Sequence, residues 1–490
     1  MSTTLRRRGG ASTLSATIQE ADSESDLTIL EGDEKQPAVE IHAEKGERDM
    51  FDSSEAFAVG LKAQSEGLHA HHPMIMIPGV ISTGLESWGT ANISRSYFRK
   101  RLWAAYDWRL SYPNLEVRDR YFTKLKSYLE ISLETSGTKA VLVSHSMGSQ
   151  VLFYFFHWVA SESGGQGGDD WVERHVDSWI NISGCMLGAV KGVTAILSGE
   201  MRDTAQLNAF AVYGLEKFLS REERAELFRA MPGISSMLPM GGNAVWGDAS
   251  GAPDDQHGQK LSYGSFLNFR VEPNATTPSR NMTVNEAMDY LSETTDPWYR
   301  DMIKRSYSNG IAHNKAEVDA NEKDPRKWVN PLETRLPLAP NLKIYCFYGV
   351  GKPTERGYYY RGPEKPGHSR LNITIDTALT AEGVDHGVIM GEGDGTVNLL
   401  STGYMCNRGW RMKRYNPAGA KITVVEMPHE PERFNPRGGP KTADHVDILG
   451  RQTLNELIIK VAAGQGHTIE DYVVSNILEY ADKVQVGDAE

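Results

Sequence analysis

A serine in the segment Ser-His-Ser-Met-Gly, residues 144–148, is the first candidate for chemistry in this chain. The apolar run 140–143 precedes it and the apolar run 150–156 follows it, which predicts a strand and a helix with Ser146 at the turn between them. The small residues Ser144 and Gly148 suit such a sharp turn, because bulkier side chains would collide with the strand and the helix. Ser144 stands where glycine is commoner. An ordinary turn serine would not need these flanking runs, so the pattern favours a nucleophile.

A nucleophilic serine needs a histidine as base and a carboxylate that orients the histidine. In a strand-turn-helix setting these partners follow the serine in the order acid, then histidine. Asp394 lies between two glycines in a tight turn, where its carboxylate either reaches a neighbouring loop or only stabilises the turn. His429 and His445 both follow the last predicted strand. Local reasoning does not separate the two histidines, and one of them is expected to be structural.

The elements that must position these residues alternate along the chain. The predicted strands are residues 74–77, 104–106, 140–143, 179–182, 342–348 and 422–427. Strands that alternate with helices predict an α/β fold with a mostly parallel sheet and helices on both faces, and the serine turn makes it an α/β-hydrolase fold. One helix is expected from about Leu115 to Glu134, capped by Asn114 and ended by Gly137. Its apolar face would hold Val117, Tyr121, Leu125, Tyr128 and Leu129.

The chain is expected to have a polar tail and one large domain. Residues 1–50 begin with three arginines and continue with Ser, Glu and Asp, so they bury too little apolar surface to fold alone and predict a disordered tail. Residues 51–490 form the predicted domain. The stretch from about 186 to 340 is too long for a simple crossover between strands and is expected to be an inserted cap. Its apolar segment 233–241 would either line a lipid-sized groove or belong to the cap core.

Composition indicates a large enzyme and excludes some partners. Acidic residues outnumber basic ones 64 to 52, and the net charge of -12 argues against broad nucleic-acid binding. No apolar run is long enough for a transmembrane segment, and no apolar core of a signal peptide is present at the start of the chain. Three cysteines are too few for a disulfide scaffold, although one bridge would fit an oxidising compartment. Five Asn-x-Ser/Thr sequons permit a lumenal location, but that of Asn181 falls in a predicted core strand.

Several motifs occur in an order that resembles a known family. Residues 77–88, 105–110, 144–148, 393–397 and 444–450 look like those of fungal-type phospholipid:diacylglycerol acyltransferases, the intracellular relatives of lecithin:cholesterol acyltransferase. The similarity extends from about residue 57 to about residue 464. The resemblance implies the following roles: Ser146 as nucleophile, Asp394 as orienting acid, His445 as base, the N–H groups of Met147 and Val80 as oxyanion hole, and Trp88 beside the substrate ester. It also implies a disulfide between Cys346 and Cys406, and Cys185 is expected to be a buried free thiol.

The same resemblance implies an activity and a location. The expected reaction moves an acyl group from the sn-2 position of a glycerophospholipid to diacylglycerol through a serine acyl-enzyme, giving triacylglycerol and lysophospholipid. It implies no metal, no cofactor and no obligate protein partner, but contact with a membrane surface in or on the endoplasmic reticulum, lumenal or membrane-associated. Two alternatives remain: a phospholipase or esterase that uses the same triad, and an inactive truncated form.

Two departures from the family affect these expectations. Relatives usually carry a transmembrane helix upstream, whereas here a polar tail leads straight to the catalytic region. Relatives also have a longer stretch at the join between Trp103 and Ala104, which holds a lid and the first crossover helix. A shortened lid predicts an uncovered apolar strip near Ile77 and Tyr106, an open approach to Ser146 and a shift from acyl transfer toward hydrolysis.

Overall fold

The computed structural model describes residues 58–80, 101–207, 209–259, 261–270, 280–362, 373–435 and 437–487. Residues 54–490 form one compact unit. The predicted tail 1–50 and Trp88 lie outside the described residues.

A six-stranded sheet forms the centre of this unit, with the strand order β12-β7-β4-β3-β1-β2. Every neighbouring pair is parallel, which confirms the predicted sheet. The strands are β1 (Met74–Ile77), β2 (Arg101–Trp103), β3 (Ala140–His145), β4 (Val176–Ile182), β7 (Lys343–Val350) and β12 (Lys421–Pro428). The prediction of a strand at 104–106 was wrong, because residues 101–103 are the ones that pair with β1. Parallel strands buried on both faces read as continuous apolar runs, as five of these strands do.

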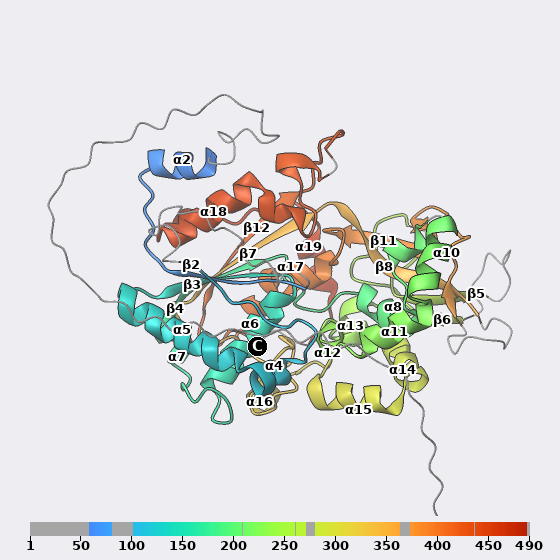
Figure 1. The fold of residues 1–490 in the computed structure, drawn as a ribbon, viewed down its shortest axis with the longest axis horizontal. Coiled ribbons are helices and arrows are strands. Elements are labelled where there is room, and N and C mark those ends of the chain that lie inside the picture. Colours follow the sequence, from blue (N-terminus) through green and yellow to red (C-terminus); the bar gives the residue numbers. More distant parts are fainter. Residues whose placement is uncertain are drawn as a thin grey trace, which may run out of the picture. The chain divides into compact units, whose positions relative to one another are not determined.

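Helices cover both faces of the central sheet (Figure 1). On one side lie α2 (Ala58–Ser65) and α18 (Gln452–Ala462), and Leu454 and Val461 of α18 pack on Val143 and Ile180 of the sheet. On the other side lie α5 (Tyr121–Ser136), α6 (Met147–Ala160) and α7 (Trp171–His175). This arrangement of layers confirms the expected α/β-hydrolase type of fold.

The single helix predicted for residues 115–134 is two helices. Helix α4 (Tyr112–Asp119) starts after Ser111 rather than Asn114, and Arg120 at φ 54° separates it from α5. The break changes the helical phase, so Val117 is 75% exposed while Leu125 and Leu129 are buried. Gly137 ends α5 in the left-handed conformation, as the sequence indicates.

A second sheet lies beside the first, with the order β10-β11-β8-β5-β6 and β9 paired to β8. Its strands are β5 (Leu267–Arg270), β6 (Arg280–Met282), β8 (Lys352–Arg361), β9 (Thr374–Ile375), β10 (Val384–Asp385) and β11 (Val388–Gly393). Only β5 and β8 pair in parallel. The predicted cap, about 186–340, thus supplies β5 and β6, and residues that follow the cap supply the other strands.

Short helices make up most of the remaining structure. Those in the predicted cap are α8 (Lys191–Ser198), α9 (Arg202–Ala205), α10 (Ala209–Phe218), α11 (Arg221–Arg229), α12 (Pro232–Ser235), α13 (Gly242–Trp246), α14 (Val284–Thr294), α15 (Pro297–Ser306) and α16 (Lys315–Asn321). Helices α17 (Leu399–Asn407) and α19 (Ile477–Lys483) follow it. Within segment 233–241, Ile234, Leu238 and Met240 are buried in the main hydrophobic core, which favours the cap-core interpretation over a groove.

The expected uncovered strip beside the sheet is not present. Ile77 and Tyr106 are both buried, and the Tyr106 ring lies 5.6 Å from the Tyr121 ring of α5. The hydroxyl group of Tyr121 also donates a hydrogen bond to the carbonyl of Ala104, the residue that directly follows the short join. Helix α5 therefore covers the Tyr106 side of the surface that the shortened join was expected to expose.

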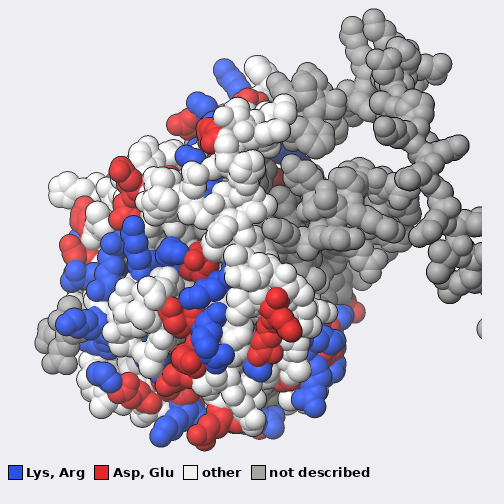
Figure 2. All heavy atoms as spheres, turned by 90° about the vertical axis from the view of Figure 1, so that its left-hand side faces the viewer, with Lys and Arg blue, Asp and Glu red and all other residues white. Residues whose placement is uncertain are grey.

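The length of the helices and the distribution of surface charge bear on binding to membranes and to nucleic acids. Among the described residues, no helix combines the length and the apolar character needed to cross a bilayer. Figure 2 shows that Lys and Arg are interspersed with Asp and Glu on the visible face of this unit. That face therefore offers no continuous basic surface to a nucleic acid.

Candidate active site

Ser146 lies at a sharp turn between β3 and α6. Its backbone adopts φ 55° and ψ -128°, a strained conformation for a residue with a side chain. A Cβ at Gly148 would lie 2.6 Å from the carbonyl oxygen of Ile77, so only glycine fits there. The departure at Ser144 has a structural reason, because its hydroxyl accepts a hydrogen bond from the buried Trp179 indole at 2.7 Å.

Ser146, His445 and Asp394 form a hydrogen-bonded chain. His445 Nε2 lies 2.8 Å from Ser146 Oγ, and His445 Nδ1 lies 2.6 Å from Asp394 Oδ2. All three residues are at least 93% buried. The second carboxylate oxygen, Asp394 Oδ1, accepts from the N–H groups of Thr396 and Val397 at 3.0 and 2.8 Å. These bonds leave Oδ2 for Nδ1–H of His445, so Nε2 is free to accept the serine proton.

The backbone of His445 is held from both sides. Its N–H donates to the carbonyl of Asp394 at 2.9 Å, and its own carbonyl accepts from Nε2 of His145 at 2.8 Å. Burial, together with the neighbouring His445, lowers the pKa of His145 to about 3. His145 is therefore neutral at ordinary pH and carries its proton on Nε2. Sequence reasoning missed this contact, although His145 directly precedes the serine.

The structure does not bring His429 into the triad. His429 Nδ1 instead accepts a hydrogen bond from the N–H of Ala443 at 3.0 Å. Burial lowers the pKa of His429, which keeps the ring in the neutral form that can accept this bond. His429 thus links the end of β12 to the segment that leads to His445.

The predicted oxyanion-hole residues flank the serine turn. Met147 is the first residue of α6, where backbone N–H groups have no partner within the helix. Val80 follows Gly79, and a Cβ at Gly79 would lie only 2.8 Å from Ser146 Cβ. The backbone after β1 therefore passes very close to the serine.

The three cysteines lie near the same elements. Cys346 of β7 and Cys406 of α17 form a disulfide with a Cα–Cα distance of 6.4 Å. This bridge joins the central sheet to the helix that follows Asp394. Cys185 is a free, fully buried thiol beside Ser146, and burial raises its pKa to about 12.

Strand β8 contacts the loops that carry Asp394 and His445. The ammonium group of Lys352 pairs with the carboxylate of Asp444, next to His445. Thr354 Oγ1 accepts from the N–H of Gly395 at 2.8 Å. The second sheet thereby holds the turn of Asp394 and the loop of His445 in one place.

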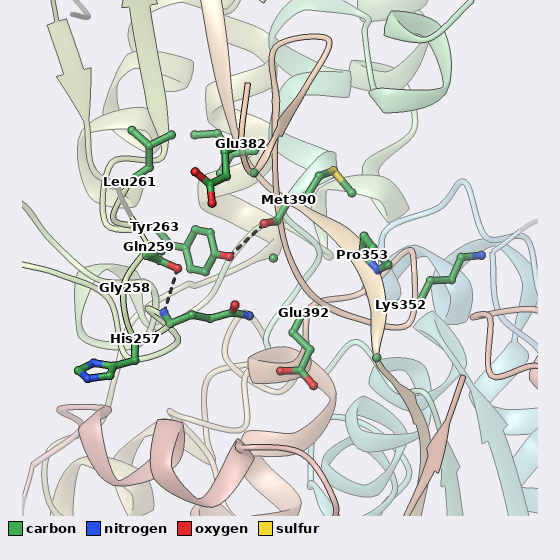
Figure 3. Close-up of a pocket in the computed structure, with 15 residues that line it drawn as sticks. His257, Gly258, Gln259, Leu261, Tyr263, Lys352, Pro353, Glu382, Met390 and Glu392 are labelled. Carbon is green, nitrogen blue, oxygen red and sulfur yellow. Dashed lines mark hydrogen bonds between the residues drawn. The ribbon is translucent and has the colours of Figure 1, made fainter. Parts of the chain in front are cut away.

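A cavity of about 580 Å³ lies between the loop 256–263, the start of β8 and β11 (Figure 3). Lys352 and Glu392 line it, but no residue of the triad does. It is therefore separate from Ser146, His445 and Asp394. Among the described residues, no group of three or more His, Cys, Asp or Glu is arranged to hold a metal ion.

Comparison with known proteins identifies the family. Fold and layer order are those of an α/β-hydrolase-type enzyme. Residues 85–452 match the family model for lecithin:cholesterol acyltransferase. The chain is 43% identical to the phospholipid:diacylglycerol acyltransferase of Schizosaccharomyces pombe, with 87% of this chain and 78% of the relative covered. It is 39% identical to that of Saccharomyces cerevisiae (89% and 77% covered) and 31% identical to phospholipid:diacylglycerol acyltransferase 1 of Arabidopsis thaliana (87% and 86%). The chain belongs to the lecithin:cholesterol acyltransferase family and is an acyltransferase.

The same alignments show that relatives contain segments that this chain lacks. The alignment with the Schizosaccharomyces pombe protein extends over 502 positions, more than the 490 residues of this chain, while it includes only 87% of them. The chain therefore has internal gaps relative to that protein.

Proposed function

We propose that this protein transfers the sn-2 acyl group of a glycerophospholipid to diacylglycerol, with Ser146 as nucleophile, His445 as base and Asp394 as orienting acid. The observation that carries the proposal is the chain of 2.6 and 2.8 Å hydrogen bonds from Asp394 through His445 to Ser146. The substrate classes come from the names of the fungal relatives.

The first step forms the acyl-enzyme. Ser146 Oγ attacks the ester carbonyl carbon while its proton moves to His445 Nε2. The developing oxyanion is stabilised by the N–H groups of Met147 and Val80, and each such donor typically lowers the barrier by about 3 to 4 kcal/mol. The carbon–oxygen bond to the glycerol then breaks, and the leaving oxygen takes the proton from Nε2. Lysophospholipid is released.

The second step transfers the acyl group. A diacylglycerol hydroxyl gives its proton to His445 Nε2 and attacks the acyl carbon. The bond to Ser146 Oγ breaks, Oγ recovers the proton, and triacylglycerol leaves. Triacylglycerol forms only if diacylglycerol reaches the acyl-enzyme before water does.

Hydrolysis is the second candidate function. The shortened lid that the family resemblance implies favours it, since a shorter lid would shield the acyl-enzyme less from water. The same triad would then yield free fatty acid. For either function we propose that Trp88 lies beside the substrate ester, as the family resemblance implies.

We also propose a location in or on the endoplasmic reticulum, as the family resemblance implies. The disulfide between Cys346 and Cys406 supports an oxidising compartment such as its lumen.

One experiment tests the function. Purified protein is incubated with diacylglycerol and a phospholipid labelled in its sn-2 acyl chain, and the labelled lipids are separated. Labelled triacylglycerol that requires diacylglycerol supports the proposal, whereas label in free fatty acid alone supports hydrolysis. The Ser146→Ala variant is the control and should give neither product.

A further inference from the structure

A hairpin-shaped loop, the hairpin 430–441, is described over residues 430–435 and 437–441 and connects β12 to the loop of His445. The N–H of Glu430 donates to the carbonyl of Lys441 at 3.2 Å, and the N–H of Glu432 donates to the carbonyl of Gly438 at 2.9 Å. Arg451 fixes the base of this hairpin, because its Nη1 donates to the carbonyls of Pro428 and Lys441, each at 2.8 Å. The neighbouring elements β12 and α18 can be followed in Figure 1. Hydrogen bonds thus hold the base of the hairpin in place.

The hairpin carries one exposed aromatic ring and two exposed arginines. Phe434 is 95% exposed, and Arg433 and Arg437 on either side of it are also exposed. Among the described residues no salt bridge is recorded for either arginine, whereas Lys441 pairs with Glu430 at 3.3 Å. Exposing an aromatic ring to water is unfavourable in free energy, so this part of the hairpin is suited to an interface.

The chemistry of these side chains fits one kind of partner. Aromatic rings are favoured at the boundary between headgroups and acyl chains, and unpaired arginines bind lipid phosphates. The protein as a whole carries a net charge of -12, so an anionic surface would repel most of it and attraction must be local. The two arginines beside Phe434 provide that local attraction.

We propose that the hairpin 430–441 docks the protein on a phospholipid surface that contains anionic headgroups. Phe434 inserts at the headgroup level, while Arg433 and Arg437 bind phosphates. The choice of a lipid rather than a protein surface rests on the proposed function, whose substrates reside in membranes. Because the hairpin ends four residues before His445, docking also brings the loop of His445 to the surface that supplies the substrate.

The chain contains a matched control for Phe434. Phe218 at the end of α10 is 92% exposed, but the adjacent Lys217 already lies over the Tyr213 ring at 5.1 Å. Helix α10 belongs to the predicted cap, and no hydrogen bond or salt bridge connects it to the hairpin among the described residues. A Phe218→Ser variant removes the same side chain from a different surface.

Vesicle binding tests the proposal directly. The full chain carrying Ser146→Ala, which prevents turnover, is mixed with phosphatidylcholine vesicles with or without phosphatidylserine, and bound protein is measured by flotation. Phe434→Ser should lower the partition coefficient roughly tenfold or more. Arg433→Gln combined with Arg437→Gln should remove most of the gain from phosphatidylserine, roughly tenfold. Phe218→Ser should bind like the parent.

Three results would overturn the proposal. Binding unchanged by Phe434→Ser would do so and would leave a protein as the partner of the hairpin. A loss with Phe218→Ser in place of Phe434→Ser would assign docking to α10. If the double arginine variant binds both vesicle types as tightly as the parent binds vesicles with phosphatidylserine, the arginines have no role in docking.

A second measurement separates docking from catalysis. In the chain with Ser146 intact, Phe434→Ser should react with a soluble fluorophosphonate at the rate of the parent, which also shows that the variant is folded. Its activity on vesicles should fall together with binding. If the parent itself does not react, the proposed function fails, while the vesicle-binding result still decides the docking proposal.

Discussion

The two sheets of this protein differ in construction and in what they contribute to the triad. The central sheet is wholly parallel, and its carboxyl edge carries Ser146 after β3 and His445 in the segment beyond β12. The second sheet is mostly antiparallel, and its strand β11 ends directly before Asp394. The proposed nucleophile and base therefore depend on one sheet and the proposed acid on the other. Changes confined to one sheet should therefore have separable effects.

The largest effect is expected from residues at the edge of the central sheet. Ser146→Ala and His445→Ala should each lower turnover by roughly 10⁵-fold or more, because neither proton transfer nor acyl-enzyme formation remains. His429→Ala should stay within a few-fold of the parent, since His429 only links loop segments. Turnover on labelled phospholipid measures all three. A His429→Ala variant as inactive as His445→Ala would contradict the assignment.

The contribution of the second sheet is expected to be smaller. Asp394→Asn keeps the shape of the turn but favours the wrong tautomer of His445, so kcat should fall roughly 10⁴-fold. Fluorophosphonate labelling should slow in parallel, and far-UV circular dichroism should not change. A loss of less than tenfold would show that another group orients His445.

The disulfide joins the central sheet to helix α17, and its loss should affect stability. Cys346→Ala combined with Cys406→Ala should lower the free energy of unfolding by about 2 to 4 kcal/mol, since the unfolded chain is no longer constrained. Urea unfolding with and without a reductant measures this. The double variant is its own control, because a reductant should not change its midpoint. The prediction is refuted if mass spectrometry shows that the reductant has fully reduced the parent protein while its free energy of unfolding is unchanged.

His145 should make the central sheet sensitive to acid. Its pKa is about 3 in the folded protein and about 6.5 when unfolded, so between these values only the unfolded state gains a proton. The contribution of neutral His145 to the free energy of unfolding is fully present above about pH 6.5 and is lost as the pH falls. Between pH 7 and pH 5 the loss should be about 2 kcal/mol. In urea unfolding, the His145→Gln variant should lose correspondingly less free energy of unfolding between pH 7 and pH 5 than the parent. An identical loss would exclude His145 as the cause.

The smallest expected effect concerns the ion pair between β8 and the loop of His445. Lys352→Met should lower kcat a few-fold with KM unchanged, because a partly exposed pair contributes about 1 kcal/mol or less to orienting Asp444 and its neighbour. Lys343→Met is the control, since Lys343 pairs with Asp177 in a similarly exposed position of the central sheet. Equal kinetic effects of both variants would indicate general destabilisation rather than loop orientation.

The two sheets also differ in how far the sequence predicts them. Five strands of the central sheet are apolar runs whose position is evident from local composition. Strand β2 has only three residues, 101–103, and is defined by pairing with β1, so the prediction misplaced it. The strands of the second sheet depend on partners far away in the chain, such as β5 with β8, and no local pattern identifies them.

The candidate site shows the same division. Ser146 is recognisable from the small residues around it, whereas the glycine-flanked turn of Asp394 leaves two interpretations open. The choice between His429 and His445 rested on a family resemblance, because both follow the same strand. The bonds from His145 and Lys352 to the loop of His445 join residues far apart in the sequence, and side-chain type alone does not predict such contacts.

The strand order of the central sheet has a consequence for synthesis on the ribosome. From β1 outward, β3, β4, β7 and β12 are added to one edge in the order in which they are translated. Roughly 160 residues separate β4 from β7, so at typical elongation rates the edge of β4 stays unpaired for about 8 to 30 s. An unpaired edge strand can pair with another chain. The nascent protein is therefore most exposed to aggregation, and most dependent on chaperones, while its middle third is being made.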